Sequence, residues 1–142
     1  MQQVKHLLEA KGKGAYSVAP DAPVIDAIRV MAEKNVGALV VIKGSELVGI
    51  VSERDYARKV ILKDRSSRDT PVADIMTASV VTVAPDATVD ECMRLCTDSR
   101  FRHLPVLDNG RVIGMISIGD LVKATISEQK ETINQLESYI AG

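Results

Sequence analysis

Aromatic residues are scarce in this 142-residue chain, which has no tryptophan, one phenylalanine and three tyrosines. Proteins that bind single-stranded nucleic acid stack its bases on aromatic side chains, so a nucleic-acid partner is not expected. Net charge is also nearly absent, because 18 lysines and arginines face 19 acidic residues. The formal charge of −1 gives no general attraction to nucleic acid or to an anionic membrane.

Long apolar runs are missing as well. No run of about 18 apolar residues could cross a bilayer, and the first residues lack the apolar segment and cleavage site of a signal peptide. We therefore expect no membrane association and a cytoplasmic location. A hydrophobic content of 46% and a charged content of 26% are typical of a folded chain, and the length suits one globular body.

Cysteine is limited to Cys92 and Cys96, whose separation of four residues places both on one face of a helix. We expect them to be buried in the core. His6 and His103 lie at no zinc-ligand spacing, so no metal is predicted. Neither cysteine is expected to lie near His103 as a nucleophile, and neither a Gly-x-Ser-x-Gly nor a phosphate-loop pattern is present. No catalytic residue is predicted, and an enzyme is not expected.

An internal repeat organises the chain. The stretches Gly49–Asp55 and Gly114–Asp120 share one skeleton: glycine, two apolar residues, serine, two variable residues and aspartate. Subtracting 49 from 114 gives an offset of 65, and identical residues recur at this offset without gaps. These further pairs are Val18 and Val83, Pro20 and Pro85, Asp21 and Asp86, Val24 and Val89, Arg29 and Arg94, Leu39 and Leu104, and Val41 and Val106.

Both copies show the same order of secondary-structure signals. A β-prone segment (16–18 or 80–83) ends at a proline, and an apolar stripe with helical spacing follows, for which Asp21 and Asp86 are the expected caps. Two apolar runs then form a hairpin (38–42 with 47–51, and 104–107 with 112–116), and a second helix starts at Ser52 or Ser117. The residues of the two helical stripes are Val24, Ala27, Ile28 and Met31, and Val89, Cys92, Met93 and Cys96.

The expected fold is therefore α/β (α+β), with two pseudo-symmetric β-α-β-β-α repeats packed sheet to sheet. The predicted parts are an N-terminal helix and loop (1–14), repeat 1 (15–62), a linker (63–77), repeat 2 (78–124) and a C-terminal helix (125–142). The linker should contain a short helix with Thr70 as its cap and Pro71 at its first position. In the last helix, Ile126, Ile133 and Ile140 recur every seven residues. This helix either forms a dimer or packs on its own domain.

These features resemble a family. Two β-α-β-β-α units that each end in Gly-x-x-Ser-x-x-Asp, with Arg102–Val106 (RHLPV) before the second and Asp74–Thr77 (DIMT) between them, resemble a tandem pair of cystathionine-β-synthase (CBS) domains, or Bateman module, of the stand-alone bacterial type. The resemblance covers roughly Ala15 to Ala124. It implies an adenine-nucleotide pocket at each Ser-x-x-Asp motif, in the cleft between the repeats, with the aspartate on the ribose and the serine near phosphate.

The resemblance implies two groups of ligand-binding residues, each with adenine against the first strand segment of the opposite repeat. Site A consists of Ser117, Asp120, Arg102, His103, Leu104, Pro105, Ile116 and Gly119 with Ala15, Tyr16 and Ser17. Site B consists of Ser52, Asp55, Arg54, Gly37, Ala38 and Val51 with Thr77, Val80 and Thr82.

The chemistry of these residues suits the implied roles. A carboxylate can accept hydrogen bonds from both ribose hydroxyls, and a serine hydroxyl with the first N–H groups of a helix can donate to phosphate. A competing interpretation is a capping box, in which serine and aspartate satisfy the same N–H groups with no ligand present.

The two sites should differ in preference. Arg102 and His103 could neutralise phosphate, whereas Gly37 and Ala38 at the equivalent positions cannot. We expect AMP as the main ligand, with ATP, ADP or NAD(H) as alternatives. A basic set able to reach a longer phosphate chain comprises Arg54, Arg58, Arg65, Arg68, Arg100 and Arg102.

The expected function is that of a cytoplasmic homodimeric sensor of energy or redox state. It would bind an adenine nucleotide and act on an unknown protein partner through a ligand-dependent conformational change. The alternative is a constitutive dimerisation or assembly module that has no regulatory ligand.

Overall fold

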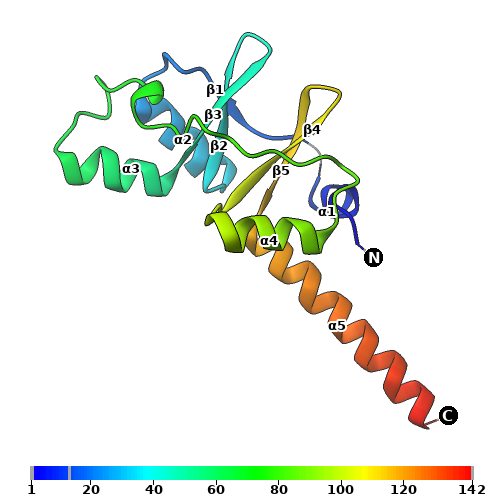
Figure 1. The fold of residues 1–142 in the computed structure, drawn as a ribbon. Coiled ribbons are helices and arrows are strands. Elements are labelled where there is room, and N and C mark those ends of the chain that lie inside the picture. The colour runs from blue at the N-terminus through cyan, green and yellow to red at the C-terminus, as the bar shows by residue number, and fades with distance from the viewer. Residues whose placement is uncertain (1, 13, 142) are drawn as a thin grey trace. The chain divides into compact units, whose positions relative to one another are not determined.

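A computed structural model describes residues 2–12 and 14–141, which fall into two compact units (Figure 1). The repeat-1 unit comprises residues 14–81 with 110–112. The repeat-2 unit comprises residues 2–12, 82–109 and 113–141. The predicted mixed α/β fold class is confirmed. Residues 1, 13 and 142 of the predicted terminal segments lie outside the described residues.

The repeat-1 unit contains a three-stranded sheet in the order β1-β2-β3. Strand β1 pairs with β2 in parallel, and β2 pairs with β3 in the predicted antiparallel hairpin. The elements are β1 (Ser17–Val18), α2 (Val24–Lys34), β2 (Ala38–Lys43), β3 (Glu46–Ser52), α3 (Glu53–Lys59) and two 3-10 turns, η1 (Ile61–Lys63) and η2 (Val72–Asp74).

The repeat-2 unit contains a two-stranded sheet, β4-β5, and three helices. Its elements are α1 (Val4–Lys11), α4 (Val89–Ser99), β4 (His103–Asp108), β5 (Arg111–Ser117) and α5 (Ile118–Ala141). The predicted turn at Asn109 and Gly110 is confirmed, since both residues have the positive φ that a two-residue hairpin turn requires.

The predicted strand 80–83 is reduced to a single parallel bridge between Val83 and Val106. In repeat 1 the longer strand β1 is held by Val40 N, which donates to Tyr16 O at 3.1 Å. The residue equivalent to Val40 is Pro105, which has no N–H to donate. Loss of this bond explains why the first strand of repeat 2 does not extend.

The predicted helix caps, Asp21 and Asp86, are wrong. Each aspartate lies in a turn that begins at the preceding proline, and helices α2 and α4 start three residues later, after Pro23 and Thr88. The Thr88 hydroxyl accepts a hydrogen bond from Glu91 N at 3.1 Å and so caps α4.

The predicted linker helix is also shorter than expected, because only the 3-10 turn η2 forms. Its cap is Pro71, which has an extended backbone, and not Thr70. The carbonyl of Thr70 instead accepts a hydrogen bond from Val24 N at 2.8 Å, and the Thr70 side chain is buried. This hydrogen bond attaches the linker to the start of α2.

The N-terminal segment holds repeat 2 in the way that the linker holds repeat 1. Val72 N donates to Ala22 O at 2.8 Å, and Val4 N donates to Ala87 O at 2.9 Å. The acceptors differ by the repeat offset of 65, whereas the donors differ by 68 (72 minus 4). Further bonds of the same kind join Ala73 N to Pro20 O and Lys5 N to Pro85 O, both at 2.9 Å. The duplication thus includes these two segments.

The motif glycines allow this packing. A Cβ at Gly114 would lie 2.6 Å from Leu8 Cδ2, and a Cβ at Gly49 would lie 2.7 Å from Met76 Sδ and 2.9 Å from Thr77 O. All three distances are too short for a Cβ atom, so each strand needs glycine where the holding segment crosses it. The glycine that opens the motif therefore serves the core.

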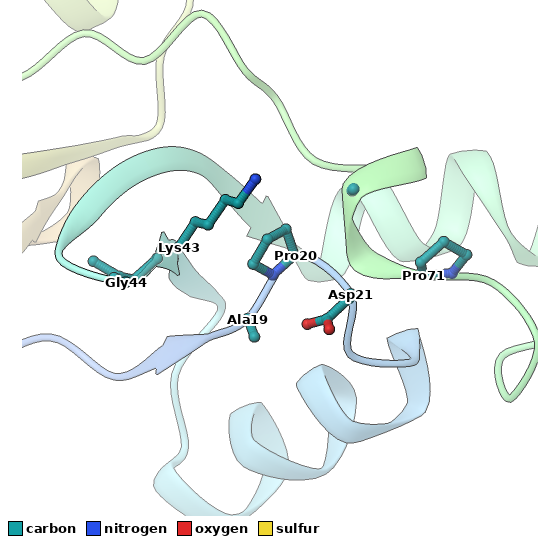
Figure 2. A pocket seen from close by; sticks show the side chains of 8 residues that line it. Ala19, Pro20, Asp21, Lys43, Gly44 and Pro71 are labelled. Atoms are coloured by element: carbon teal, nitrogen blue, oxygen red, sulfur yellow. The ribbon is translucent and has the colours of Figure 1, made fainter.

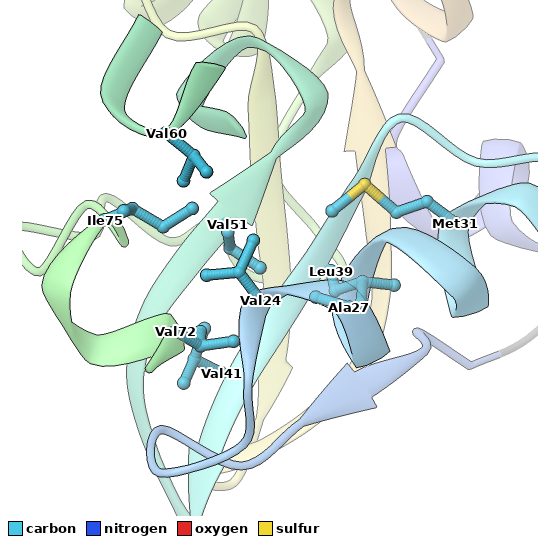
Figure 3. Close-up of a cluster of buried hydrophobic side chains, with 9 residues drawn as sticks. All are labelled: Val24, Ala27, Met31, Leu39, Val41, Val51, Val60, Val72 and Ile75. Carbon is cyan, nitrogen blue, oxygen red and sulfur yellow. The ribbon is translucent and has the colours of Figure 1, made fainter. Parts of the chain in front are cut away.

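Aliphatic side chains from every layer of the repeat-1 unit form its core (Figure 3). Helix α2, the hairpin strands and the linker all contribute fully buried residues. Burial of apolar surface stabilises the folded state by about 25 cal/mol per Å². The cluster consists of Val24, Ala27, Met31, Leu39, Val41, Val51, Val60, Val72 and Ile75.

Cys92 and Cys96 are buried on one face of α4, as predicted. Burial raises the pKa of Cys92 to about 11, with smaller contributions from Cys96 and Glu91, and burial likewise raises the pKa of Cys96. Both thiols are therefore protonated and unreactive near neutral pH.

Only the first turns of helix α5 have residues that are buried in its own unit. Leu121 and Ala124 are its buried residues, and every residue from Ile126 to Ala141 is exposed. In Figure 1 this part extends away from α1, α4 and the β4-β5 sheet of the same unit. The interpretation of this helix as a tail packed on its own domain is therefore wrong, because the heptad residues contact no core. None of the described helices is long and apolar enough to span a membrane.

The contact between Gly114 and Leu8 predicts a non-additive mutational effect. Gly114→Ala should lower the free energy of unfolding by about 1–3 kcal/mol, because the new methyl group meets Leu8 Cδ2. In a Leu8→Val background, which lacks both Cδ atoms, the same change should cost much less. Urea unfolding of the four proteins measures this coupling. An equal cost in both backgrounds would contradict the contact.

Candidate functional site

Both Ser-x-x-Asp junctions form capping boxes. At the second junction, Ser117 N donates to Asp120 Oδ2 at 2.8 Å and Asp120 N donates to Ser117 Oγ at 3.1 Å. At the first, Ser52 N donates to Asp55 Oδ2 at 3.0 Å and Asp55 N donates to Ser52 Oγ at 3.1 Å. The competing interpretation of the motif is thus confirmed as local geometry, and a ligand would have to use the atoms that remain.

One further N–H of each helix start is occupied by the preceding hairpin strand. Glu53 N donates to Gly37 O at 3.1 Å, and Ile118 N donates to Arg102 O at 2.9 Å. The donors and the acceptors both differ by 65, so this hydrogen bond is equivalent in the two repeats. These bonds fix Gly37 and Arg102 next to the serine and aspartate of their own repeat.

A lysine binds the aspartate at each junction, but it comes from a different place. Lys59 is one turn along α3 from Asp55, with Nζ 3.3 Å from Oδ1, and it also donates to Ile75 O at 2.9 Å. Lys11 comes from the end of α1, donates to Asp120 Oδ2 at 2.7 Å and also donates to Met115 O at 2.9 Å. Sequence reasoning paired neither lysine with an aspartate. The i,i+4 spacing could have identified Lys59, but no local pattern points to Lys11.

The carboxyl group of Asp120 is tuned by these contacts. Burial would raise its pKa, but the hydrogen bond from Lys11, the bonds from Ser117 and the Lys11 charge outweigh burial and lower the pKa below its ordinary value of 3.8. Asp120 is therefore ionised at neutral pH and remains a strong hydrogen-bond acceptor.

The two junctions leave different atoms for a ligand. At the first, Asp55 Oδ1 faces Lys59, and the Ser52 hydroxyl donates to Asp55 Oδ2 at 3.0 Å. At the second, Lys11 and Ser117 N share Oδ2. Within the described part of the chain, these two bonds end on Oδ2 and not on Oδ1, and the Ser117 side chain also hydrogen-bonds the Asp120 carboxylate. The second junction thus offers a carboxylate oxygen, Asp120 Oδ1, whose counterpart at the first junction faces Lys59.

The other predicted residues of site A that belong to the repeat-2 unit lie near this junction. Arg102 immediately precedes β4, which begins at His103. Gly119 is the second residue of α5, where an added Cβ would make only an ordinary contact with Ser117 Oγ at 3.6 Å. Leu104, Pro105 and Ile116 are buried in the core. Ala15, Tyr16 and Ser17 belong to the repeat-1 unit, where the Tyr16 ring lies 5.4 Å from Lys34 Nζ. Their part in site A stays a prediction.

Site B is similarly divided. Ala38 pairs with Ser52 in the hairpin, Thr77 exchanges two backbone hydrogen bonds with Ile50, and Val51 is buried. Arg54 is exposed at the start of α3, and Val80 lies in the same unit. Thr82 belongs to the repeat-2 unit, so its part in site B stays a prediction. Of the predicted basic set, Arg65 pairs with Asp74 at 2.7 Å, which removes it as an obvious phosphate ligand.

A hollow of about 580 Å³ lies elsewhere in the repeat-1 unit (Figure 2). It is near the turn of the β2-β3 hairpin, at the opposite end of β2 from Ala38, and it contains none of the predicted site residues. Most of its lining residues are small or apolar, and Asp21 and Lys43 are its charged residues. It lacks the convergent polar groups of a specific ligand site. Among residues 2–12 and 14–141, no cluster of three or more histidine, cysteine or acidic side chains could hold a metal ion.

Two α/β repeats, each with a capped Ser-x-x-Asp junction, make up most of the described residues. The CBS-domain family model matches residues 12–62 and 72–127, so the chain belongs to the CBS-domain family and carries two CBS repeats. The predicted tandem pair is confirmed.

Known proteins resemble the chain closely. It is 44% identical to the CBS domain-containing protein CBSX3, mitochondrial, of Arabidopsis thaliana, over 98% of this chain and 72% of that protein. A solved structure of a protein with CBS domains from Burkholderia ambifaria is 53% identical, with a TM-score of 0.85 over 90% of this chain and 96% of that one. The CBS domain pair of MJ0100, solved with 5-methylthioadenosine and S-adenosyl-L-methionine, shares the fold (TM-score 0.79; 90% of this chain, 98% of that one) at 22% identity.

The Lys11 contact predicts a pH-dependent change in stability. A lowered folded-state pKa contributes stability above the ordinary value of 3.8, and this contribution is lost as pH falls through the folded pKa. Lys11→Met should therefore lower the free energy of unfolding by up to about 1 kcal/mol near neutral pH, and the difference from wild type should shrink well below pH 3.8. Denaturant unfolding across this range measures it, with Lys5→Met, an exposed lysine of the same helix, as control. A difference that persists at low pH would contradict the ion pair.

Proposed function

We propose that this CBS-domain pair is a regulatory module that binds an adenine nucleotide at site A, with AMP as the preferred ligand. ADP, ATP and NAD(H) are the alternatives. The observation that carries the proposal is the second carboxylate oxygen of Asp120: among the described residues, Lys11 Nζ and Ser117 N both donate to Oδ2, and Oδ1 remains for a ligand.

The groups at the second junction suit the two polar ends of a nucleotide. An ionised carboxylate oxygen accepts hydrogen bonds from vicinal ribose hydroxyls, and the ordered Ser117 hydroxyl with Gly119 N can donate to a phosphate. Arg102, whose carbonyl accepts a hydrogen bond from Ile118 N, adds a positive charge to this junction. The 5-methylthioadenosine and S-adenosyl-L-methionine of the MJ0100 pair support the choice of an adenosine-containing ligand for this fold.

Site B is the weaker of the two sites in this proposal. Lys59 holds Asp55 from within the same helix, so a ligand would have to break an i,i+4 ion pair as well as the Ser52 hydroxyl bond. At site A the corresponding lysine comes from α1 and binds the other carboxylate oxygen. A nucleotide can therefore engage Asp120 without displacing Lys11.

The regulatory action follows from differential affinity. A ligand that binds one arrangement of the protein more tightly than another shifts the population toward it, and this changes the surface presented to a protein partner. The proposal includes a homodimer in the cytoplasm and requires no chemical step by the protein. A constitutive assembly module is the second candidate, and the exposed apolar residues of α5 are the observation that favours it.

Gly119→Ala separates a ligand site from a simple helix cap. The new methyl group fits against Ser117 Oγ, and alanine favours a helix by up to about 1 kcal/mol over glycine, so the melting temperature should stay equal or rise. It would nevertheless obstruct a phosphate at this helix start, so AMP affinity measured by calorimetry should fall at least about 10-fold, or 1.4 kcal/mol. Ser127→Ala, farther along the exposed face of α5, is the matched control. Unchanged AMP affinity in Gly119→Ala would overturn the phosphate position.

Alanine at each aspartate tests which junction binds. A nucleotide at 100 times its Kd should stabilise the protein by about 2.7 kcal/mol, which a thermal-shift assay detects. Asp120→Ala should abolish the shift caused by AMP, whereas Asp55→Ala should retain it. A panel of AMP, ADP, ATP, NAD and NADH that shifts neither wild type nor variants would favour the assembly module.

A further inference from the structure

The exposed part of α5 carries a continuous apolar seam. Its residues alternate in spacings of four and three along the helix, and none of them is buried in the repeat-2 unit to which α5 belongs. Exposed fractions are 43% for Val122, 47% for Ile126, 53% for Ile133, 57% for Leu136 and 82% for Ile140. One polar residue, Gln129, occupies the remaining position of the seam. Alternating spacings of this kind are the a and d positions of a coiled coil.

We propose that α5 pairs in antiparallel orientation with α5 of a second copy of this chain, about a two-fold axis that passes beside Glu131. The inference rests on the homodimer part of the proposed function and adds to it the surface and the orientation. In this arrangement positions whose numbers add to 262 form layers. Val122 meets the partner's Ile140, Ile126 meets the partner's Leu136, and Gln129 meets the partner's Ile133.

The seam is self-complementary in this register. All six of its positions find a seam partner in the second copy, and only the layer at Gln129 contains a polar side chain. A single polar residue in an apolar seam makes shifted registers less stable. In a shifted register Gln129 would face a different residue, or an isoleucine of the seam would have no apolar partner. An unrelated partner would need to reproduce this spacing, whereas a second copy has it by symmetry.

Charges beside the seam favour the antiparallel orientation. Lys123, Lys130 and Glu137 occupy the e positions, which face e positions of the partner in an antiparallel pair. Lys123 of each copy then lies beside Glu137 of the other, which gives two attractive pairs. The two copies of Lys130 face each other and form one repulsive pair. In a parallel pair these residues would face the g positions, Thr125, Thr132 and Tyr139, and no opposite charges would meet.

The first experiment tests the surface. Sedimentation equilibrium of the full chain should show a dimer for wild type and a monomer for Ile133→Glu, which places a charge in the seam. Ser138→Glu, on the outer face of the same helix, is the matched control and should remain a dimer. Since these side chains are exposed, neither change should alter the melting temperature of the folded units.

The second experiment tests the orientation. Chains with Ile126→Cys and chains with Leu136→Cys, distinguished by a tag, are oxidised separately and as a mixture. The antiparallel pair predicts disulfides only in the mixture, because two copies of residue 126 would lie about 15 Å apart along the axis. A parallel pair predicts disulfides in each variant alone. Wild type is the control, since Cys92 and Cys96 are buried.

Charge reversal gives a third readout. Lys123→Glu should weaken dimerisation about 10-fold, because two attractive pairs become repulsive, and adding Glu137→Lys should restore it. A wild-type monomer throughout the micromolar range would overturn both this pairing and the homodimer itself. A dimer that survives Ile133→Glu, or that cross-links as a parallel pair, would overturn only the pairing. AMP binding, measured in the same variants, should be unchanged in every case.

Discussion

Ser117 N–H donates to the Asp120 carboxylate, and Asp120 N–H donates back to the Ser117 hydroxyl; the same pair of bonds joins Ser52 and Asp55. These bonds fix the residue at which each hairpin ends and each following helix begins, and they hold the carboxylate in one orientation. The strand before the hairpin turn, the helix start and the proposed ligand atoms all depend on this junction. A helix cap and a ligand site are therefore compatible uses of one motif, because the cap occupies only one carboxylate oxygen.

The two lysines make the repeats unequal. A duplicated chain could have kept the same partner at both aspartates, but Lys59 lies within the helix it caps, whereas Lys11 reaches Asp120 from the segment that holds repeat 2. The contact with Lys11 keeps Asp120 ionised and leaves one carboxylate oxygen available. It also makes the N-terminal helix part of the second junction. In the proposed function, binding at Asp120 would be linked to the packing of α1, and this link would give a ligand a route to alter the repeat-2 unit.

Much of this architecture could be predicted from the sequence, because the offset of 65 made each repeat a check on the other. The hairpins, the helix starts at Ser52 and Ser117 and the buried cysteines were correct. The errors have local physical causes. Pro105 removes one ladder hydrogen bond and shortens the first strand of repeat 2, and the prolines at 20 and 85 form turns that leave the adjacent aspartates outside the helices. Lys11 and the offset of 68 between the two holding segments could not be found, since both depend on contacts between residues far apart in the chain.

The central claim is that the carboxylate of a helix cap also holds ribose. Calorimetric titration of the wild-type protein with AMP and with 2′-deoxy-AMP tests it most directly, since the two ligands differ by one hydroxyl group. A hydrogen bond to a charged group contributes about 1.5–3 kcal/mol, so the deoxy ligand should bind at least about 10-fold more weakly. Equal affinity for the two nucleotides, or no binding of either, would contradict the account.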